Sequence, residues 1–296
     1  MDFATYNPLS LIIKDQGWLE KDLAAKNVTV KWVKSAGSNK ANELLRSGSA
    51  DVASTAGSAA LLARANGSPI KTIDVYSQPN WSALVVRGDS RIAGPKDLIG
   101  KKVAATTGTD PYFFLLQSLK AAGVDIKSVE VVNLQHADGR TALDTGRVDA
   151  WAGLDPIMAA AQAENGDKIV YDHVDYNSYG FLNATEKFLA QSPDLAQTVV
   201  DEYERARAWA KQNPDRTAAI LAGVAGVKPE IARATLARTT LAIDPAPGAK
   251  QAAVLEVIGP ILVANGNVSD QGQVDAALSS LFDPAWAKQA DPKIGS

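Results

Sequence analysis

Three short loops in the sequence combine glycine with hydroxyl side chains directly before a predicted helix. They are Ser35–Asn39, Thr55–Ala59 and Thr106–Pro111, and each follows a predicted strand. A helix N-terminus attracts an anion through its free N–H groups and its dipole, glycine lets the anion approach the backbone, and a hydroxyl adds a donor. One such loop is more often an ordinary helix cap, but three at equivalent strand ends predict a site for a small oxyanion.

The ligand-binding candidates in these loops are their glycines and hydroxyls and the acid of the third loop: Gly37, Ser38, Gly57, Ser58, Gly108, Thr109 and Asp110. Aromatic residues near the loops could hold the organic part of a ligand, because small-molecule pockets combine apolar walls with a few fixed polar groups. The candidates are Tyr6, Trp81 and Trp151. Tyr112 and Phe113 begin an apolar helical face and are expected in the core.

Two titratable side chains, His136 and Asp155, each have two possible roles. His136 follows a predicted strand, where it is either a solvated loop residue or a ligand contact. Asp155 precedes Pro156 at a strand-to-helix turn, where it is either a helix cap or a cleft carboxylate that meets a ligand amine.

Composition excludes several classes of function. The 296 residues include 30 Lys+Arg and 33 Asp+Glu, giving a net charge of −3 without a basic cluster, so neither nucleic acid nor a membrane surface is an expected partner. Cysteine is absent and only two histidines occur, so we expect no metal site. The sequence lacks the phosphate-loop and dinucleotide motifs, the nucleophile elbow and the HExxH motif, which gives no cofactor and no standard catalytic arrangement.

The elements that must position these loops alternate between helices and strands over the first 180 residues, which is typical of an α/β protein. Two strand–helix–strand sets repeat a Gly-x-x-Asp step, at Gly48–Asp51 and Gly146–Asp149. Any two such units share this pattern, but it also fits two similar lobes. Extended segments near 78–86 and 176–184 predict two crossings between lobes. Residues 1–82 and 180–296 would form lobe I, and 83–179 lobe II.

Helices are expected at 9–25, 40–47, 115–122, 140–145, 193–212, 214–225, 229–238, 248–264 and 274–282, and strands at 2–6, 28–33, 50–54, 75–86, 129–134, 148–152 and 179–184. Beyond residue 185 the pattern is helical, and proline opens three of these helices at their first residue. We expect them to pack around lobe I and to brace lobe II.

Several local patterns together resemble the periplasmic solute-binding proteins of ABC importers. They are Asn7-Pro8 opening a helix, Gly17-Trp18-Leu19-Glu20, Gly48-x-x-Asp51-Val52-Ala53, Gly57-Ser58, Asp97-Leu98-x-Gly100-Lys101-Lys102-Val103-Ala104, Thr107-Gly108-Thr109 and Gly146-x-Val148-Asp149-Ala150-Trp151. Within that family the chain is similar to the branch that serves aliphatic sulfonates, taurine and nitrate. The chain departs from the commoner sulfonate pattern at Tyr6-Asn7-Pro8, which replaces a Gln-containing stretch, and at Asp110-Pro111, where a Ser or Asn often follows. Tyr6 and Asn7 are both candidate ligand contacts.

The resemblance implies a two-lobed class II periplasmic-binding-protein-like α/β fold with the ligand cleft between the lobes and a helical C-terminal region. It implies a periplasmic monomer, its signal segment removed, that delivers a small anion such as a sulfonate to a permease and ATPase in sulfur metabolism. The alternative is a dehydratase-type enzyme on the same fold that acts on a small carboxylate, with Asp155 or His136 as base. A thiamine-pyrimidine synthase would need cysteines, and a transcription regulator would need a helix-turn-helix segment.

Overall fold

The computed structural model, which describes residues 1–291, contains two large β-sheets and a two-stranded parallel ribbon. The first sheet has the order β11-β4-β10-β3 and the second the order β7-β6-β8-β5-β9. The strands are β1 (Asp2–Phe3), β2 (Val33–Lys34), β3 (Val52–Ala56), β4 (Ile70–Pro79), β5 (Ser82–Val86), β6 (Lys102–Ala105), β7 (Glu130–Asn133), β8 (Ala150–Leu154), β9 (Lys168–Asp172), β10 (Gly180–Thr185) and β11 (Thr239–Thr240).

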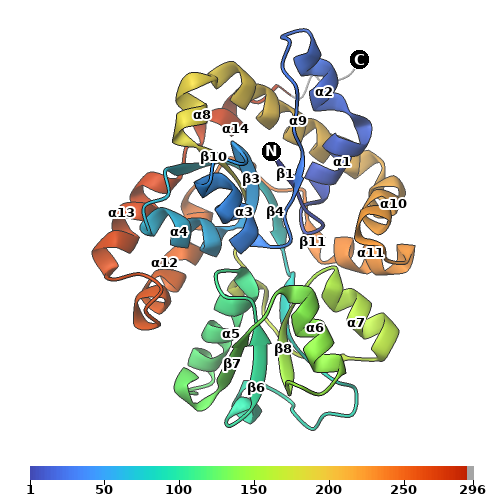
Figure 1. The fold of residues 1–296 in the computed structure, drawn as a ribbon, viewed down its shortest axis with the longest axis vertical. Helices are drawn as coiled ribbons and strands as arrows, with labels where there is room; N and C mark the ends of the chain where they lie inside the picture. Colours follow the sequence, from blue (N-terminus) through green and yellow to red (C-terminus); the bar gives the residue numbers. More distant parts are fainter. Residues whose placement is uncertain (292–296) are drawn as a thin grey trace.

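The two sheets are built from different stretches of the chain. The first sheet combines β3 and β4, which end by Pro79, with β10 and β11, which begin at Gly180 and Thr239. Strands between Ser82 and Asp172 form the second. The chain therefore passes between the sheets twice, and Figure 1 shows the second sheet with its helices below the rest of the molecule. We keep the names lobe I and lobe II, and the residue boundaries given above stay a prediction.

Both sheets contain antiparallel strand pairs, and the lobe II sheet also contains parallel ones. In lobe I, β10 lies between β3 and β4 and is antiparallel to both. In lobe II, β6 is parallel to β7 and β8, and β5 is antiparallel to β8 and β9. Most strands of both sheets are buried on both faces, as expected of sheets covered by helices. The sheets thus present their strand ends, with the helices that follow them, toward the junction between the lobes.

Five helices cover the lobe sheets near this junction: α3 (Ser38–Arg46), α4 (Gly57–Ala65), α5 (Asp110–Ala121), α6 (His136–Asp144) and α7 (Ile157–Asn165). α4 begins at the residue after β3 ends. α5 begins five residues before the predicted start, because Thr109 precedes it in an extended conformation and Pro111 fits its first turn. Each of these starts places a helix N-terminus at the lobe junction.

The first predicted helix is two helices, α1 (Pro8–Gln16) and α2 (Trp18–Ala24). Gly17 between them has φ of 62°, a left-handed conformation that ends α1 and that glycine adopts without strain. Apolar residues on both helices belong to the core of lobe I, where Trp18 packs edge-on against Trp209 at a centroid distance of 6.2 Å. The periodicity was continuous through the break, so the sequence showed one helix where the chain bends.

The C-terminal region is helical, as predicted: α8 (Glu186–Gln191), α9 (Pro193–Gln212), α10 (Pro214–Ala225), α11 (Pro229–Ala237), α12 (Ala249–Ala264), α13 (Gln271–Leu281) and α14 (Ala285–Gln289). Two of these helices also contact lobe II. Leu255 and Ile258 of α12 share a buried cluster with Phe113 and Leu116 of α5. Ile231 of α11 packs with Ala159 and Ala160 of α7. The short 3-10 turns are η1 (Pro95–Leu98), η2 (Ile126–Ser128) and η3 (Val174–Tyr176).

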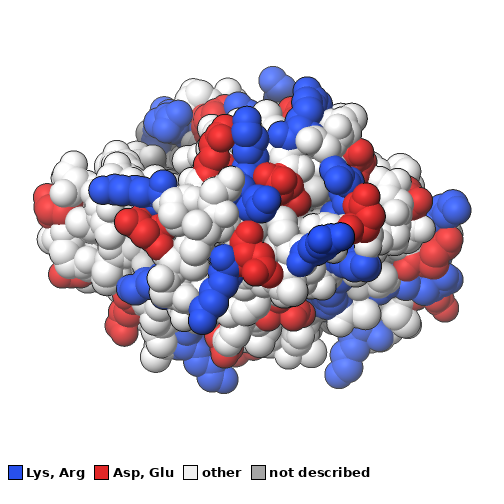
Figure 2. Space-filling view, turned by 90° about the horizontal axis from the view of Figure 1, so that it is seen from below, with Lys and Arg blue, Asp and Glu red and all other residues white. Residues whose placement is uncertain are grey.

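The charged residues show no single-sign field on the face of Figure 2, where lysine and arginine alternate with aspartate and glutamate. Within residues 1–291, no helix combines the length and the apolar character needed to cross a membrane. In the same residues, no three His, Cys, Asp or Glu side chains are grouped so that they could hold a metal ion.

Candidate functional site

A small enclosed cavity lies between the lobes. Its volume is about 10 Å³, close to the smallest that holds one water molecule, and it is lined by Tyr6, Ser38, Ala56, Trp81, Thr109, Asp110, Pro111, His136 and Leu154. The structure thus brings together Tyr6, Ser38, Trp81, Thr109, Asp110 and His136 of the predicted site. The sequence did not single out Ala56, Pro111 and Leu154 as lining residues, because small and apolar residues at strand and helix ends carry no chemical signal.

Four helix N-termini meet at this cavity. Ser38, Asp110 and His136 are the first residues of α3, α5 and α6, and Ala56 is the cap residue of α4. The first N–H groups of a helix have no acceptor within the helix, and the helix dipole adds positive potential there. The cavity is therefore suited to negative charge although no arginine or lysine lines it.

The Asp110 carboxylate already occupies part of this positive region. Its Oδ1 accepts from the hydroxyls of Ser58 at 2.5 Å and Ser178 at 2.6 Å, and its Oδ2 accepts from Trp81 Nε1 and Ser178 N, both at 2.8 Å. Burial raises the pKa of Asp110, while the hydrogen bonds from Ser178, Ser58 and Trp81 oppose this rise. The Ser58 hydroxyl, predicted to bind the ligand anion, thus donates to Asp110. Ser178 is a further polar residue of the site that sequence reasoning missed.

Ser38 keeps a free donor at the cavity. Its Oγ accepts from the backbone N–H of Ala56 at 2.9 Å, so the Ser38 hydroxyl hydrogen is available to a ligand. The Thr109 hydroxyl instead donates to the carbonyl of Thr106 at 2.6 Å. Of the three predicted hydroxyl donors, Ser38 is therefore the one that the structure leaves to donate into the cavity.

Two aromatic rings form the apolar wall. Tyr6 and Trp81 pack edge to face with ring centroids 6.0 Å apart. The Tyr6 hydroxyl lies 3.0 Å from the Ser54 carbonyl and 3.0 Å from Ser35 Oγ, so its polar end is satisfied inside lobe I. The Tyr6 hydroxyl is thus held within lobe I, while Tyr6 also lines the cavity.

His136 lies at the start of α6 and is 1% exposed. Its Nδ1 is 3.1 Å from the Thr106 hydroxyl, and its Nε2 has no hydrogen-bond partner among the described residues. Burial alone lowers the pKa of His136 to about 4, so the ring is neutral in the ligand-free protein at pH 7. The structure excludes the solvated-loop interpretation and places His136 at the cavity.

The predicted glycines allow close approach around the cavity. A Cβ added at Gly37 would lie 2.9 Å from His136 Nε2, and one at Gly57 would lie 2.9 Å from the Phe181 ring. Gly108 has φ of 77°, a left-handed conformation that lets the chain turn before Thr109. These three glycines shape the loops that hold the lining side chains.

Asn7 and Trp151 lie outside the cavity lining. Asn7 caps α1 by accepting from Ser10 N at 3.3 Å and donates to the Tyr203 hydroxyl at 2.9 Å, so both ends of its amide are used. Trp151 is fully buried in lobe II, and a Cβ at Gly139 of α6 would lie 2.8 Å from its Nε1. The roles of Asn7 and Trp151 in binding stay predictions, and their surroundings favour structural roles.

Trp151→Phe is expected to lower the free energy of unfolding by about 2 kcal/mol, because it leaves a cavity in the lobe II core. The Kd for a ligand is expected to stay within twofold of wild type. Urea unfolding and calorimetric titration check the two effects. Trp81→Phe is the contrast, because it removes a donor to Asp110 and alters the cavity wall, so it should change both quantities. A tenfold loss of affinity in Trp151→Phe would show that Trp151 belongs to the site.

Asp155 is 2% exposed and pairs with Arg238, which follows α11. Its Oδ1 accepts from Arg238 Nη2 at 2.9 Å and from Ala159 N at 3.0 Å, while Oδ2 lies 2.8 Å from Arg238 Nε as an ion pair. Burial raises the pKa of Asp155 to about 6, against the lowering effect of the Arg238 charge. The cap interpretation of Asp155 fits these contacts, and the pair with Arg238 joins the C-terminal helices to lobe II.

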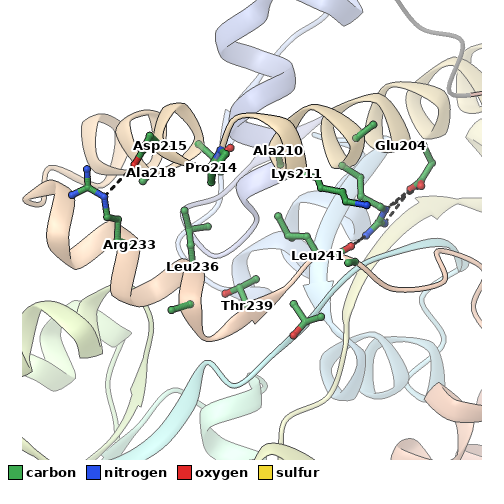
Figure 3. Close-up of a pocket in the computed structure, with 16 residues that line it drawn as sticks. Glu204, Ala210, Lys211, Pro214, Asp215, Ala218, Arg233, Leu236, Thr239 and Leu241 are labelled. Carbon is green, nitrogen blue, oxygen red and sulfur yellow. Dashed lines mark hydrogen bonds and ion pairs between the residues drawn. The ribbon is translucent and has the colours of Figure 1, made fainter.

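A larger hollow lies elsewhere, between α9, α10, α11 and β11 of lobe I (Figure 3). Two ion pairs stand among its lining residues, Arg207 with Glu204 at 3.0 Å and Arg233 with Asp215 at 3.4 Å. It is lined from one lobe only and holds none of the candidate residues. The enclosed cavity between the lobes is the better candidate site.

Comparison with protein families and curated proteins finds matches over most of the chain. The model of the family described as "NMT1/THI5 like" matches residues 12–217. A putative aliphatic sulfonates-binding protein of Escherichia coli K12 is 29% identical over 219 residues, which are 73% of this chain and 68% of that protein. Its counterpart in Bacillus subtilis 168 is 27% identical over 77% of this chain and 70% of that protein.

Solved structures with the same fold cover nearly the whole chain. The alkanesulfonate-binding protein SsuA of Xanthomonas axonopodis pv. citri, bound to MOPS, has a TM-score of 0.82 at 21% identity and covers 93% of this chain and 96% of its own. The periplasmic aliphatic sulphonate binding protein SsuA of Escherichia coli has a TM-score of 0.80 at 24% identity, covering 96% and 91%. The desulfurization enzyme DSZB has a TM-score of 0.67 at 17% identity, covering 97% and 96%. The predicted two-lobed periplasmic-binding-protein fold is confirmed.

Proposed function

Because the chain belongs to the NMT1/THI5-like family, we propose that it is the solute-binding protein of an ABC importer and binds a small organic oxyanion, an aliphatic sulfonate or taurine-like compound. The observation that carries this proposal is the enclosed cavity at which α3, α4, α5 and α6 begin. Its partners are then a permease and an ATPase, and it acts in the periplasm as a monomer, without a cofactor and without catalysis.

The contacts support one placement of the ligand. Asp110 takes up the donors near α4 and α5, so the starts of α3 and α6 remain for the incoming anion. The anionic head then lies by Ser38 and His136, and the Tyr6 and Trp81 rings cover the organic part. The ligand enters between open lobes and is buried when they close.

Titration calorimetry of the purified protein tests this function. The panel contains taurine, short alkanesulfonates, sulfate esters, nitrate and sulfate, in a buffer that is not itself a sulfonate. We expect micromolar or tighter binding to at least one alkanesulfonate or to taurine. Binding to none of the panel would overturn the proposed function.

Ser38→Ala is expected to weaken the Kd about tenfold, because the ligand loses one buried hydrogen bond worth about 1.4 kcal/mol. Ser118→Ala is the matched control: Ser118 is also buried, but its hydroxyl donates to the Phe114 carbonyl within α5 at 2.7 Å. Calorimetry on both variants measures the effect. An unchanged Kd in Ser38→Ala would remove Ser38 from the site.

An enzyme on the same fold is the second candidate, favoured by one observation. His136 lines the cavity and its Nε2 has no partner within residues 1–291, so it could accept a proton from a substrate such as a small carboxylate. Asp155, the other candidate base, is already paired with Arg238. Recovery of a bound carboxylate or sulfonate chemically unchanged after long incubation would exclude this alternative, and a new product would establish it.

A further inference from the structure

The hydrogen bonds around His136 determine which ring nitrogen carries its proton. The Thr106 hydroxyl lies 2.7 Å from the carbonyl oxygen of Leu134, which can only accept, so Thr106 donates its single hydrogen there. Thr106 Oγ1 also lies 3.1 Å from His136 Nδ1 and can then only accept. The hydrogen in that contact must therefore come from Nδ1. A neutral His136 consequently has a lone pair, and no hydrogen, on Nε2.

This lone pair belongs to a residue that lines the cavity, and Nε2 has no partner among residues 1–291. Nε2 lies beside Gly37 at the N-cap of α3, where an added Cβ would come within 2.9 Å of it. The proposed ligand anion would lie in this cavity. An anion oxygen placed against a lone pair is repelled, so the neutral ring opposes the anion that the helix N-termini attract.

The charged and titratable groups around His136 do not offset this repulsion between the Nε2 lone pair and an anion. Across the cavity it faces Tyr6 of lobe I and Asp110 of α5, whose carboxylate is held by four donors. α3 contributes the neutral amide of Asn39, and α6 carries the exposed Asp138 in its own first turn. No cation lines the cavity to balance the anion.

We propose that His136 takes up one proton from solvent when the anion binds, so that Nε2–H donates to the ligand. The inference rests on the proposed function and names the regulation of that site. One anion and one proton enter the site together. Nε2 gains the proton and no other bond changes, so the net charge of the closed cavity stays the same. Binding therefore weakens as pH rises, by up to tenfold in Kd per pH unit between the free and bound pKa values of His136.

Ethanesulfonate is the probe, because it stays a monoanion over the whole pH range and carries no amine. Its Kd is measured by calorimetry from pH 6 to 9 in Bis-Tris and Tris, which are not sulfonates. Proton uptake is measured in weakly buffered solution with a pH electrode. We expect about one proton taken up per ligand bound at pH 7. Histidine ¹⁵N NMR of the wild-type protein should show Nε2 changing from unprotonated to protonated on ligand addition.

His136→Gln should abolish both the proton uptake and the pH dependence of Kd. His173→Gln is the matched control, because His173, the other histidine of the chain, is 42% exposed and should leave both unchanged. Ethanesulfonate binding with no proton uptake and an unchanged Nε2 signal would overturn this inference and leave the proposed function standing. If ethanesulfonate does not bind, the inference is overturned as well, and the other panel members then decide whether the proposed function survives.

Discussion

Asp110→Ala is expected to lower the free energy of unfolding by about 4 kcal/mol. The substitution leaves the Trp81 indole N–H, the Ser178 N–H and two serine hydroxyls without the acceptor that they share. Each buried donor without a partner costs about 1–3 kcal/mol, but the hydroxyls of Ser58 and Ser178 lie 3.4 Å apart and can partly satisfy each other. Urea unfolding at pH 7 measures the loss.

Asp110→Ala also tests whether the donors that surround the Asp110 carboxylate can bind a separate anion. Formate can occupy the space left by the Asp110 carboxylate and, at ten times its Kd, should restore about 1.4 kcal/mol. Asp138→Ala is the matched control, since Asp138 is an exposed acid in the first turn of α6 and should cost about 0.5 kcal/mol with no response to formate. Equal stabilisation of wild type and Asp110→Ala by formate would show that formate does not act by replacing the Asp110 carboxylate.

Arg238→Met is expected to cost about 3–5 kcal/mol at pH 8, because it leaves the buried Asp155 carboxylate without its counter-charge. The pKa of Asp155 is already raised to about 6, above its unfolded value. The folded protein therefore binds this proton more readily than the unfolded chain, and the stability that it contributes is lost as pH rises through the folded pKa. At pH 5 Asp155 is largely protonated with or without Arg238, so the cost of the substitution should be smaller there.

Arg233→Met provides the comparison, because Arg233 lies on α11, the helix that Arg238 follows. Arg233 pairs with Asp215 at 3.4 Å, but both side chains are more than half exposed, so its loss should cost less than about 1 kcal/mol at either pH. Unfolding curves for both variants at pH 5 and 8 separate the two cases. A pH-independent loss in Arg238→Met would show that Arg238 acts by packing and not through its charge on Asp155.

Local signals made much of the fold predictable. The helices α9 and α10 span the predicted residues, because Pro193 and Pro214 mark their first residues. The strand predicted at 28–33 is reduced to Val33–Lys34, since its partner β1 has only two residues to pair with. The length of such a short strand depends on the partner strand with which it pairs and not on local propensity. The two-residue β11 escaped prediction for the same reason.

The site was predictable at its loops and unpredictable in its pairings. The glycine and hydroxyl pattern located Ser38, Thr109 and Asp110 at the cavity, because capping is a local property. That Ser58 donates to Asp110, 52 positions away, is set by how the lobes meet. Trp151 lies on a strand buried on both faces, so alternation could not tell which face it occupies. The pairing of Asp155 with Arg238 likewise needed the arrangement of α11 on α7.

The place of β10 in the lobe I sheet constrains the order in which the chain can fold. β10 lies between β3 and β4, and its Asn183 donates to Thr55 of β3, 128 positions earlier. A growing chain therefore holds β3 and β4 without the strand between them until all of the lobe II strands have been made. Lobe II is continuous in sequence and can form first, whereas lobe I must close its sheet through long-range contacts, which are slow to form. During synthesis, lobe I is thus the part that exposes unpaired strand edges to proteases and chaperones.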